Sequence, residues 1–370
     1  MKKDLLIVGG GYAGTKLTSE LKNVFNITII DENKDHIEQT EIHRYLSGKI
    51  DLSELAFSYE DFSKKNFVRF VNERVDDIDF DNNRVFFGES SLSYDYVVLA
   101  TGSKTFFPKQ IKGLEQFKKD IKSLRIIKEF KEDFFTLIDS RDNNKNIVIA
   151  GGGLSGVEIA IELAQKIRSS GLNSSDINVT LVEQQNTILP GADEFLINTT
   201  KKVLDELNIQ CVHGEFITQV EKNKITLSNK EEITYDLSLF VLGVSSEKLD
   251  NKQDISLNVK NQYIVDEYFK INHYKNAFCI GDFAQTLTPT GKYNLPTAQL
   301  ANKQASLLAL NLKNLMNKKD LVRKELILKG VLIDLGVNNA VGLIGNLKLS
   351  GYIAYILKRF TSYIHKSRFR

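Results

Sequence analysis

The sequence predicts an α/β fold built from two similar units, and repeated motifs carry this prediction. A glycine loop with the spacing GxGxxG occurs twice, as IVGGGYAGTKLT at residues 7–18 and as IAGGGLSGVEIA at residues 149–160. Each loop follows a short apolar run, at residues 4–8 and 146–150, of the kind that forms a buried parallel strand. Each loop also leads into a helical pattern. The chain therefore contains two strand–loop–helix units.

A glycine loop of this spacing favours the binding of a dinucleotide. Its first glycine permits a tight turn, its second lets the backbone approach a diphosphate, and its third lets the helix pack on the strand. The next apolar run of each unit ends in an acid, Asp31 or Glu183. A carboxylate there can bond ribose hydroxyls and repel a 2′-phosphate, so Glu183 favours NAD over NADP. In the alternative interpretation, the glycines only pack a helix on its strand and bind no ligand. This combination of loop, strand and acid would then have to occur twice by coincidence.

The composition excludes several classes of protein. A chain of 370 residues with 42% hydrophobic content can form two or three domains with their own cores. Its net charge of +2 predicts no nucleic-acid partner, and two cysteines are too few for a disulfide scaffold. The five histidines show no ligand spacing with cysteines or acids, so no metal site is expected. The chain contains no run of 18 consecutive apolar residues, so we predict no membrane-spanning helix. We expect the protein to fold in the cytoplasm.

Three further strands end in residues typical of a cofactor site. They are SLSYDYVVLATGS, ending in Ala100, Thr101 and Gly102, DLSLFVLGVSS with Gly243, and NAFCIGDFAQ with Gly281 and Asp282. Each glycine loop thus has its own closing strand, which predicts that the second unit is inserted in the first. The expected parts are a first domain at 1–115 and 246–316, an inserted domain at 116–245, and a tail region at 317–370.

Taken together, these motifs resemble the flavoproteins that bind two dinucleotides, which include the disulfide reductases and, more closely, the type II NADH:quinone oxidoreductases. The resemblance covers about residues 1–316. It rests on GGGYAG with Asp31, ATGS, GGGLSGVEIAIEL, VTLVEQQNTILP, IGDFAQ and LPTAQLANKQ. It implies two Rossmann-like domains, with non-covalent FAD at the first loop and NADH at the second. Hydride would pass from NADH to the flavin, because the cofactors carry this chemistry and the protein positions them.

The resemblance carries over to individual residues at both coenzymes. Those expected at FAD are Gly9, Gly10, Gly11, Tyr12, Ala13, Gly14, Asp31, Ala100, Thr101, Gly102, Gly281, Asp282 and Ala298. Those expected at NADH are Gly151, Gly153, Leu154, Ser155, Gly156, Glu183 and Gly243. Asp282 could instead cap a helix.

The expected electron acceptor is a quinone. The cysteine pair that the disulfide reductases keep beside the flavin is missing from residues 32–48, and Cys279 lies in an apolar strand, as a buried small hydrophobe would. The stretch PTAQLANKQ resembles the AQxAxQQ motif that lines the quinone pocket of type II enzymes. It supplies Gln299 and Gln304, but Lys303 stands where the first of the paired glutamines would be. Lys303 could bring a charged donor to the quinone or point to solvent.

Glu158, with Gln299 and Lys303, completes the set of expected catalytic residues. It matches a glutamate that type II enzymes place near nicotinamide and quinone, where it could relay a proton to reduced quinone. It could also be a first-turn acid favoured by the helix dipole. A second departure from the family is QTEIHRYLSG, at residues 39–48, where type II enzymes usually have an apolar segment with Pro-Leu-Leu-Tyr.

The last residues, SGYIAYILKRFTSYIHKSRFR, predict an amphipathic helix with a cationic end. Its apolar residues at helical spacing are Tyr352, Ile353, Ile356, Leu357, Phe360, Tyr363 and Ile364, while Lys358, Thr361, Ser362 and His365 fall largely on the other side. The apolar stripe could pack on the protein's own body. It could also lie in the headgroup layer of an anionic membrane, where quinones are at hand. Attachment through so short a tail could require a homodimer.

Three functions follow from these expectations. The favoured one is a peripheral NADH:quinone oxidoreductase on the cytoplasmic face of the cell membrane, feeding a respiratory chain without pumping protons. The alternative is a soluble NAD(P)H-dependent flavoprotein reductase of a ferredoxin-like carrier, steered by Lys303 and the basic tail. A redox sensor that uses the flavin to signal NADH level is the third, since fold does not dictate function.

Overall fold

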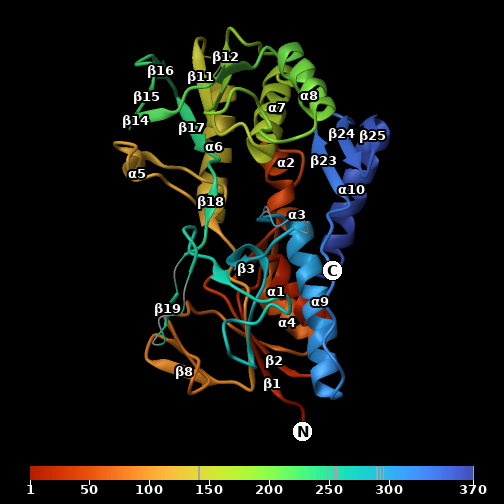
Figure 1. Cartoon of the computed structure of the whole chain (residues 1–370). Helices are drawn as coiled ribbons and strands as arrows, with labels where there is room; N and C mark the ends of the chain where they lie inside the picture. Colours follow the sequence, from red (N-terminus) through yellow and green to blue (C-terminus); the bar gives the residue numbers. More distant parts are fainter. Residues whose placement is uncertain are drawn as a thin grey trace.

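A computed structural model describes residues 1–140, 142–247, 249–251, 253, 255, 257–288, 291, 293–294 and 296–369. The fold is the predicted α/β arrangement of two parallel-sheet units with a tail beside them (Figure 1). The C-terminal Arg370, part of the predicted tail, lies outside the described residues.

The first unit is a five-stranded parallel sheet in the order β21-β9-β1-β2-β5. Its strands are β1 (Asp4–Val8), β2 (Asn26–Ile30), β5 (Arg69–Val71), β9 (Tyr96–Leu99) and β21 (Ala277–Cys279). Strand β21 pairs with β9 although the whole second unit lies between them in the sequence. The chain therefore leaves this sheet and returns to it after the second unit.

The second unit is a four-stranded parallel sheet in the order β13-β12-β11-β17. Its strands are β11 (Lys145–Ala150), β12 (Ile177–Glu183), β13 (Gln210–His213) and β17 (Leu237–Phe240). The two passages of the chain between the units run side by side, because β10 (Lys104–Thr105) pairs antiparallel with β18 (Val244–Ser245).

Helices cover both sheets, and small sheets extend them. The helices are α1 (Tyr12–Leu21), η1 (Gln39–Glu41), α2 (Ile42–Leu46), α3 (Leu52–Leu55), α4 (Tyr59–Asn66), α5 (Leu114–Phe117), α6 (Leu124–Ser140), α7 (Leu154–Ser169), α8 (Glu194–Glu206), η2 (Gly281–Phe283) and α9 (Ala298–Met316). The smaller strands are β3 (Asp35–Ile37), β4 (Ala56–Ser58), β6 (Asp77–Asp79), β7 (Arg84–Phe87), β8 (Ser90–Ser93), β14 (Ile217–Glu221), β15 (Lys224–Leu227), β16 (Glu232–Thr234), β19 (Asp250–Asn251), β20 (Tyr263–Ile264) and β22 (Ala284–Gln285).

The tail lies along one side of both units (Figure 1). It forms an antiparallel sheet of β23 (Gly330–Asp334), β24 (Ala340–Ile344) and β25 (Leu347–Gly351), followed by α10 (Tyr352–Lys366). The helix confirms the sequence prediction, whereas the three strands before it were not predicted. Ile333, Leu335 and Val341 join the apolar core of the second unit, so the tail sheet is part of that core.

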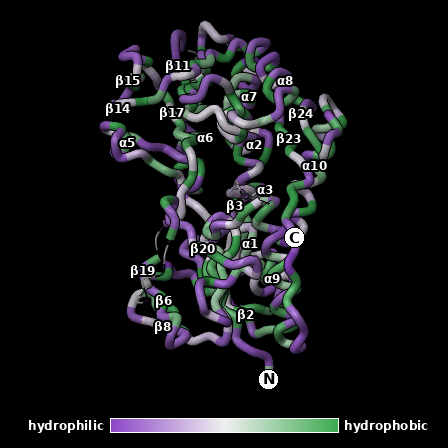
Figure 2. The backbone as a smooth tube through the Cα atoms, in the orientation of Figure 1, coloured by the Kyte–Doolittle hydropathy of each residue, from purple (hydrophilic) through white to green (hydrophobic). Residues whose placement is uncertain are grey.

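Helix α10 packs on the protein with its polar face. Its buried residues are Ala354, Lys358, Ser362, His365 and Lys366. Its exposed residues include Tyr352, Ile353, Ile356, Phe360, Tyr363 and Ile364. Hydrophilic and hydrophobic residues alternate along this helix (Figure 2). The helix docks on the protein's own body, but its apolar stripe faces outward, so the alternative in which this stripe packs on the body is wrong.

Candidate active site

The two glycine loops have matching backbone geometry at their first glycine. Gly9 and Gly151 adopt φ values of +105° and +117°, which L side chains rarely adopt. A Cβ on Gly9 would lie 2.4 Å from the carbonyl oxygen of Ala100, and a Cβ on Gly151 would lie 2.2 Å from that of Val241. Only glycine fits at either position, because the closing strand of each unit passes this close.

The other two glycines also have matching surroundings. A Cβ on Gly14 would lie 2.0 Å from the carbonyl oxygen of Gly9, and a Cβ on Gly156 would lie 1.9 Å from that of Gly151. These third glycines let the helix pack on its loop. Around Gly11 and Gly153 an added Cβ would meet no described atom within 4 Å. The middle glycine thus leaves open space in front of the helix N-terminus in both units.

Both helix starts are available to an anion. Helix α1 begins after Gly11 and α7 begins after Gly153, and within the described part of the chain neither has a side-chain cap. The first N–H groups of a helix have no partner within the helix and carry a partial positive charge. Tyr12, Ala13 and Leu154, at these two starts, line one shared cavity. The geometry is that of two diphosphate cradles.

The acid at the end of the second strand braces each loop in the same way. Asp31 Oδ2 accepts a hydrogen bond from Gly10 N at 2.7 Å, and Glu183 Oε2 accepts one from Gly152 N at 2.7 Å. Burial raises the pKa of Asp31, and the backbone hydrogen bonds oppose this change. Both acids line the cavity, where their remaining lone pairs are positioned for hydroxyl donors.

The cavity has a volume of about 1400 Å³ and connects the two cradles. Its lining includes the predicted residues Gly11, Tyr12, Ala13, Asp31, Ala100, Thr101, Gly102, Gly151, Gly153, Leu154, Ser155, Glu158, Glu183, Gly243, Gly281, Asp282 and Ala298. The predicted residues that are not among those lining it are Gly9, Gly10, Gly14, Gly156, Gln299 and Lys303. The four glycines of this second group shape the loops from behind.

Asp282 lies at the cavity and is not a helix cap. Its Oδ2 accepts a hydrogen bond from Ser103 Oγ at 2.8 Å. The N-cap of η2 is Ile280 and that of α9 is Thr297, so the capping alternative for Asp282 is wrong. Lys122, which sequence reasoning missed, lines the same cavity. Burial lowers the pKa of Lys122, and the neighbouring charge of Asp282 opposes this change.

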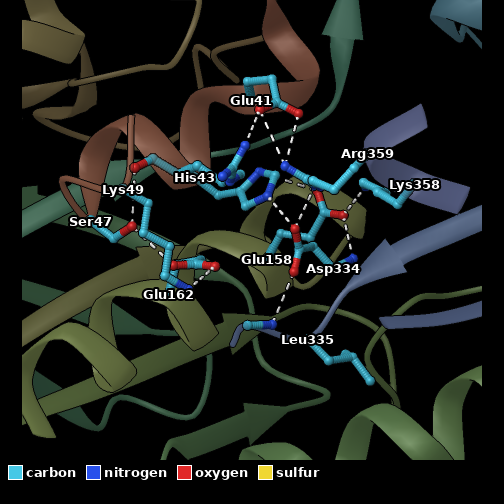
Figure 3. A network of polar contacts seen from close by, with 12 residues as sticks. Glu41, His43, Ser47, Lys49, Glu158, Glu162, Asp334, Leu335, Lys358 and Arg359 are labelled. Atoms are coloured by element: carbon cyan, nitrogen blue, oxygen red, sulfur yellow. Dashed lines mark hydrogen bonds and ion pairs between the residues drawn. The ribbon is translucent and has the colours of Figure 1, made fainter. Parts of the chain in front are cut away.

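Glu158 is held by the tail at the edge of the cavity (Figure 3). Its side chain is buried, and its Oε1 accepts a hydrogen bond from the backbone N of Asp334 at 2.8 Å. The same oxygen forms an ion pair with Lys358 Nζ. Lys358 lines the cavity beside it. The first turn of α7 contains no acid, so the helix-dipole alternative for Glu158 is wrong. Lys358 is therefore a cavity cation that reaches Glu158 from the far end of the sequence.

A buried ionic network extends from this pair (Figure 3). His43 lies between two carboxylates, with Nδ1 3.6 Å from Glu158 Oε2 and Nε2 3.2 Å from Asp334 Oδ2. Arg359 Nη2 donates to Asp334 Oδ2 at 2.6 Å, and its Nη1 donates to Glu41 Oε1 at 3.1 Å. Burial alone would raise the pKa of Glu41, but Arg359 and other cations lower it to about 2. The QTEIHRYLSG stretch supplies Glu41 and His43 to this network.

The helix that opens with PTAQLANKQ mainly fastens neighbouring segments. Gln304 Oε1 accepts from Gly281 N at 2.6 Å, which ties α9 to the strand end that bears Asp282. Gln299 Oε1 accepts from Lys329 N at 2.6 Å, and Lys303 Nζ donates to the carbonyl oxygen of Ile327. Gln299 and Lys303 thus hold the chain leading to β23, and their catalytic role stays a prediction.

Comparison with known proteins agrees with this site. The family described as pyridine nucleotide-disulphide oxidoreductase matches residues 3–305. The chain belongs to this family. The match spans both glycine loops and the Gly281–Asp282 strand end, so the protein is an oxidoreductase.

Similar proteins narrow the resemblance. The type II NADH:quinone oxidoreductase of Staphylococcus aureus strain MSSA476 is 26% identical, with 97% of this chain and 94% of that protein covered. The fold is similar to that of NDH2 from Plasmodium falciparum, solved in complex with NADH, with a TM-score of 0.86, 18% identity, and coverage of 99% and 97%. The sulfide:quinone oxidoreductase of Aquifex aeolicus has a TM-score of 0.84, 20% identity, and coverage of 99% and 91%.

Two further observations bear on the acceptor and its location. The two cysteines lie away from the lining of the cavity, and burial raises the pKa of the Cys279 thiol well above its usual value. No helix among the described residues has the length and apolar character needed to cross a membrane.

Proposed function

We propose that this protein is an FAD-dependent NADH:quinone oxidoreductase that does not pump protons. The observation that carries the proposal is the single cavity of about 1400 Å³ joining two diphosphate cradles of matching geometry. Two cradles in one cavity suit a reaction in which two dinucleotides meet.

The first cradle fits FAD. Gly11 leaves room for a diphosphate, the N-terminus of α1 provides free N–H groups, and Asp31 presents a carboxylate to ribose hydroxyls. Asp282, held by Ser103, is positioned for a further hydroxyl-bearing part of the same molecule. When bound, FAD would supply the capacity to accept hydride from NADH and to pass electrons to the acceptor.

The second cradle fits NADH. Gly153 and the N-terminus of α7 are arranged like their counterparts in the first unit. Glu183 would accept hydrogen bonds from the ribose hydroxyls and would repel a 2′-phosphate, which favours NADH over NADPH. Gly243, at the end of the closing strand, lines the cavity beside this cradle.

The Glu158–Lys358 pair supports a quinone as acceptor. Reduction of a quinone places negative charge on its oxygens, and an ammonium group is a suitable electrostatic partner and proton donor for such an oxygen. Lys358 Nζ would donate and Glu158 would hold the charge of the pair when the proton leaves. Neither cysteine reaches the cavity lining, so a thiol acceptor has no partner there.

The outer face of α10 supports binding at a membrane surface. The helix exposes aromatic and aliphatic residues, including Phe360 at 58% and Tyr363 at 61% exposure, while it carries Lys358 into the cavity on its other face. A bilayer contacting this face would bring a lipid-dissolved quinone close to Lys358. We place the protein on the cytoplasmic side as a peripheral protein, and a homodimer through this apolar face is the competing arrangement.

Steady-state kinetics tests the proposal. Purified protein with bound flavin should oxidise NADH rapidly with a soluble quinone analogue and much more slowly with ferredoxin-like carriers, and the rate should not depend on added thiols. Equal or faster turnover with a carrier protein would favour the soluble reductase, and slow turnover with every acceptor would favour a redox sensor.

A further inference from the structure

Three buried side chains near the first glycine loop form a cluster that the proposed reaction does not use. His36 lies on β3, Glu38 follows that strand, and His365 comes from α10. One donor atom from each of them, an imidazole nitrogen or a carboxylate oxygen, lies within 4.8 Å of the other two. The exposed fractions of the three residues are 2%, 0% and 6%. The cluster therefore connects the first unit to the tail.

The three side chains offer donor atoms that suit a metal ion. Imidazole nitrogens and carboxylate oxygens are common zinc ligands in proteins.

Two of these nitrogens have no partner. Within the part of the chain that the structure describes, Nε2 of His36 and Nε2 of His365 are buried without a hydrogen bond. Buried polar atoms in proteins are almost always paired, so an orphaned nitrogen beside a buried carboxylate indicates a missing partner.

A chain of proton-transfer groups explains the cluster less well. The Tyr12 hydroxyl donates to Glu38 Oε1 at 2.5 Å, and His365 Nδ1 contacts Glu38 Oε2. Such a chain would leave Nε2 of His36 and Nε2 of His365 without hydrogen-bond partners among the described residues. The nearby cation Arg368 donates from its Nη1 to Asn302 Oδ1 at 2.7 Å.

We propose that His36, Glu38 and His365 bind one divalent transition-metal ion of the zinc class. Two imidazoles and one carboxylate form a common zinc ligand set, and the Tyr12 hydroxyl or a water is available as a fourth ligand. A tetrahedral site with bonds of about 2.1 Å separates its ligand atoms by about 3.4 Å, so modest side-chain rotation closes the cluster on the ion. The ion would fasten the end of α10 to the first unit.

Metal binding by the full-length flavoprotein tests this site. After dialysis against a chelator, titration with Zn²⁺ followed by calorimetry and elemental analysis should give one ion per chain. The Tm should rise by about 5 °C at a hundredfold excess over Kd. Mg²⁺ should give no rise, because it prefers oxygen ligands. No zinc binding, or equal effects of the two ions, would overturn the proposal.

Two variants and one matched control locate the ion. His365→Gln removes a ligand but can still donate to Glu38, and His36→Phe keeps the stacking on Phe369. Each should reduce zinc from one ion per chain to none and abolish the Tm rise. His273→Gln, at an exposed histidine outside the cluster, should bind zinc like the unmodified protein. Retained stoichiometric binding in both cluster variants would contradict the assignment, whatever the rate of NADH oxidation.

Discussion

The two nucleotide units share a backbone and differ in the side chains around it. Both place three glycines and one acid in matching positions. Beside the first loop lie Tyr12, His36 and the end of α10, whereas the second loop leads to Glu158 and Lys358. The tail forms ion pairs with both units, to Glu41 and Glu38 in the first and to Glu158 in the second, and it also joins the apolar core of the second. The repeat thus provides two similar binding sites, and the tail makes them chemically different.

Substitution of the two middle glycines should separate the sites most clearly. Because an added Cβ at Gly11 or Gly153 meets no described atom within 4 Å, valine there should allow folding but fill the cradle. We expect Gly11→Val to lose nearly all flavin, and Gly153→Val to keep it while KM for NADH rises about a hundredfold. Flavin-to-protein absorbance and steady-state kinetics measure both, with Tm as the control for folding. Equal loss of flavin from the two variants would remove the assignment of one coenzyme to each loop.

Acid should weaken the ionic attachment of the tail. The pKa of Glu41 is about 2 in the folded protein and near its ordinary value of about 4.5 when unfolded. A lowered folded pKa means that the stabilisation is present above about pH 4.5 and is lost as pH falls toward 2. The full contribution is about 3 kcal/mol. Urea unfolding should show that Glu41→Gln has a lower free energy of unfolding than the unmodified protein at pH 7. This difference should become smaller as the pH falls. A constant difference would show that the ion pairs do not stabilise the tail.

Removal of the cavity cation should affect one half-reaction. In Lys358→Met, NADH should still bleach the flavin at the normal rate, while reoxidation by quinone slows about thirtyfold. The change removes the lysine partner of the buried Glu158 and costs stability, so the double variant Lys358→Met/Glu158→Gln is the folded comparison. Lys348→Met, at an exposed lysine of the same tail, is the matched control. Stopped-flow absorbance resolves the two steps, and slowing of both alike would show a structural effect only.

A charge on the outer face of α10 should weaken attachment without changing chemistry. Phe360→Asp should reduce binding to anionic lipid vesicles about tenfold, because it removes one large apolar group from the contact. Activity with a water-soluble quinone should be unchanged. Val259→Asp, at an exposed position outside the tail, is the control. Vesicle sedimentation measures the binding. If Phe360→Asp instead converts a dimer to a monomer, the face serves as a subunit interface.

Substitutions of Glu183 and Asp31 should have different effects on the selectivity between NADH and NADPH. Glu183→Gln should raise the efficiency with NADPH relative to NADH about fivefold, because the repulsion of a 2′-phosphate is reduced. Asp31→Asn should lower flavin retention and leave the NADPH-to-NADH ratio unchanged. Initial rates with both nucleotides give this ratio. A shift of similar size in Asp31→Asn would mean that the two sites are not selective in the way their sequences indicate.

The sequence predicted the features that depend on local geometry. The strands before Gly9 and Gly151, the helices after them and the acids Asp31 and Glu183 follow from short stretches of chain with strong backbone requirements. The return of β21 to the first sheet followed from counting closing strands. These features require only neighbours in sequence and the rules for parallel sheets.

Contacts between distant residues could not be predicted in the same way. Glu158 and Lys358 are separated by 200 positions, and Glu38 and His365 by 327. Hydrophobic periodicity predicted α10 but left its orientation open. The polar face of the helix lies inward because buried acids of the body pair with Lys358 and Arg359. The histidines looked scattered for the same reason, since spacing along a chain does not report distance across a fold.

Anaerobic spectroscopy of the purified protein shows whether two coenzymes react in one cavity. We expect one bound flavin per chain, bleached by one equivalent of NADH and restored by one equivalent of a soluble quinone. Colourless protein that does not take up added FAD would contradict it, as would flavin that stays reduced after the quinone is added.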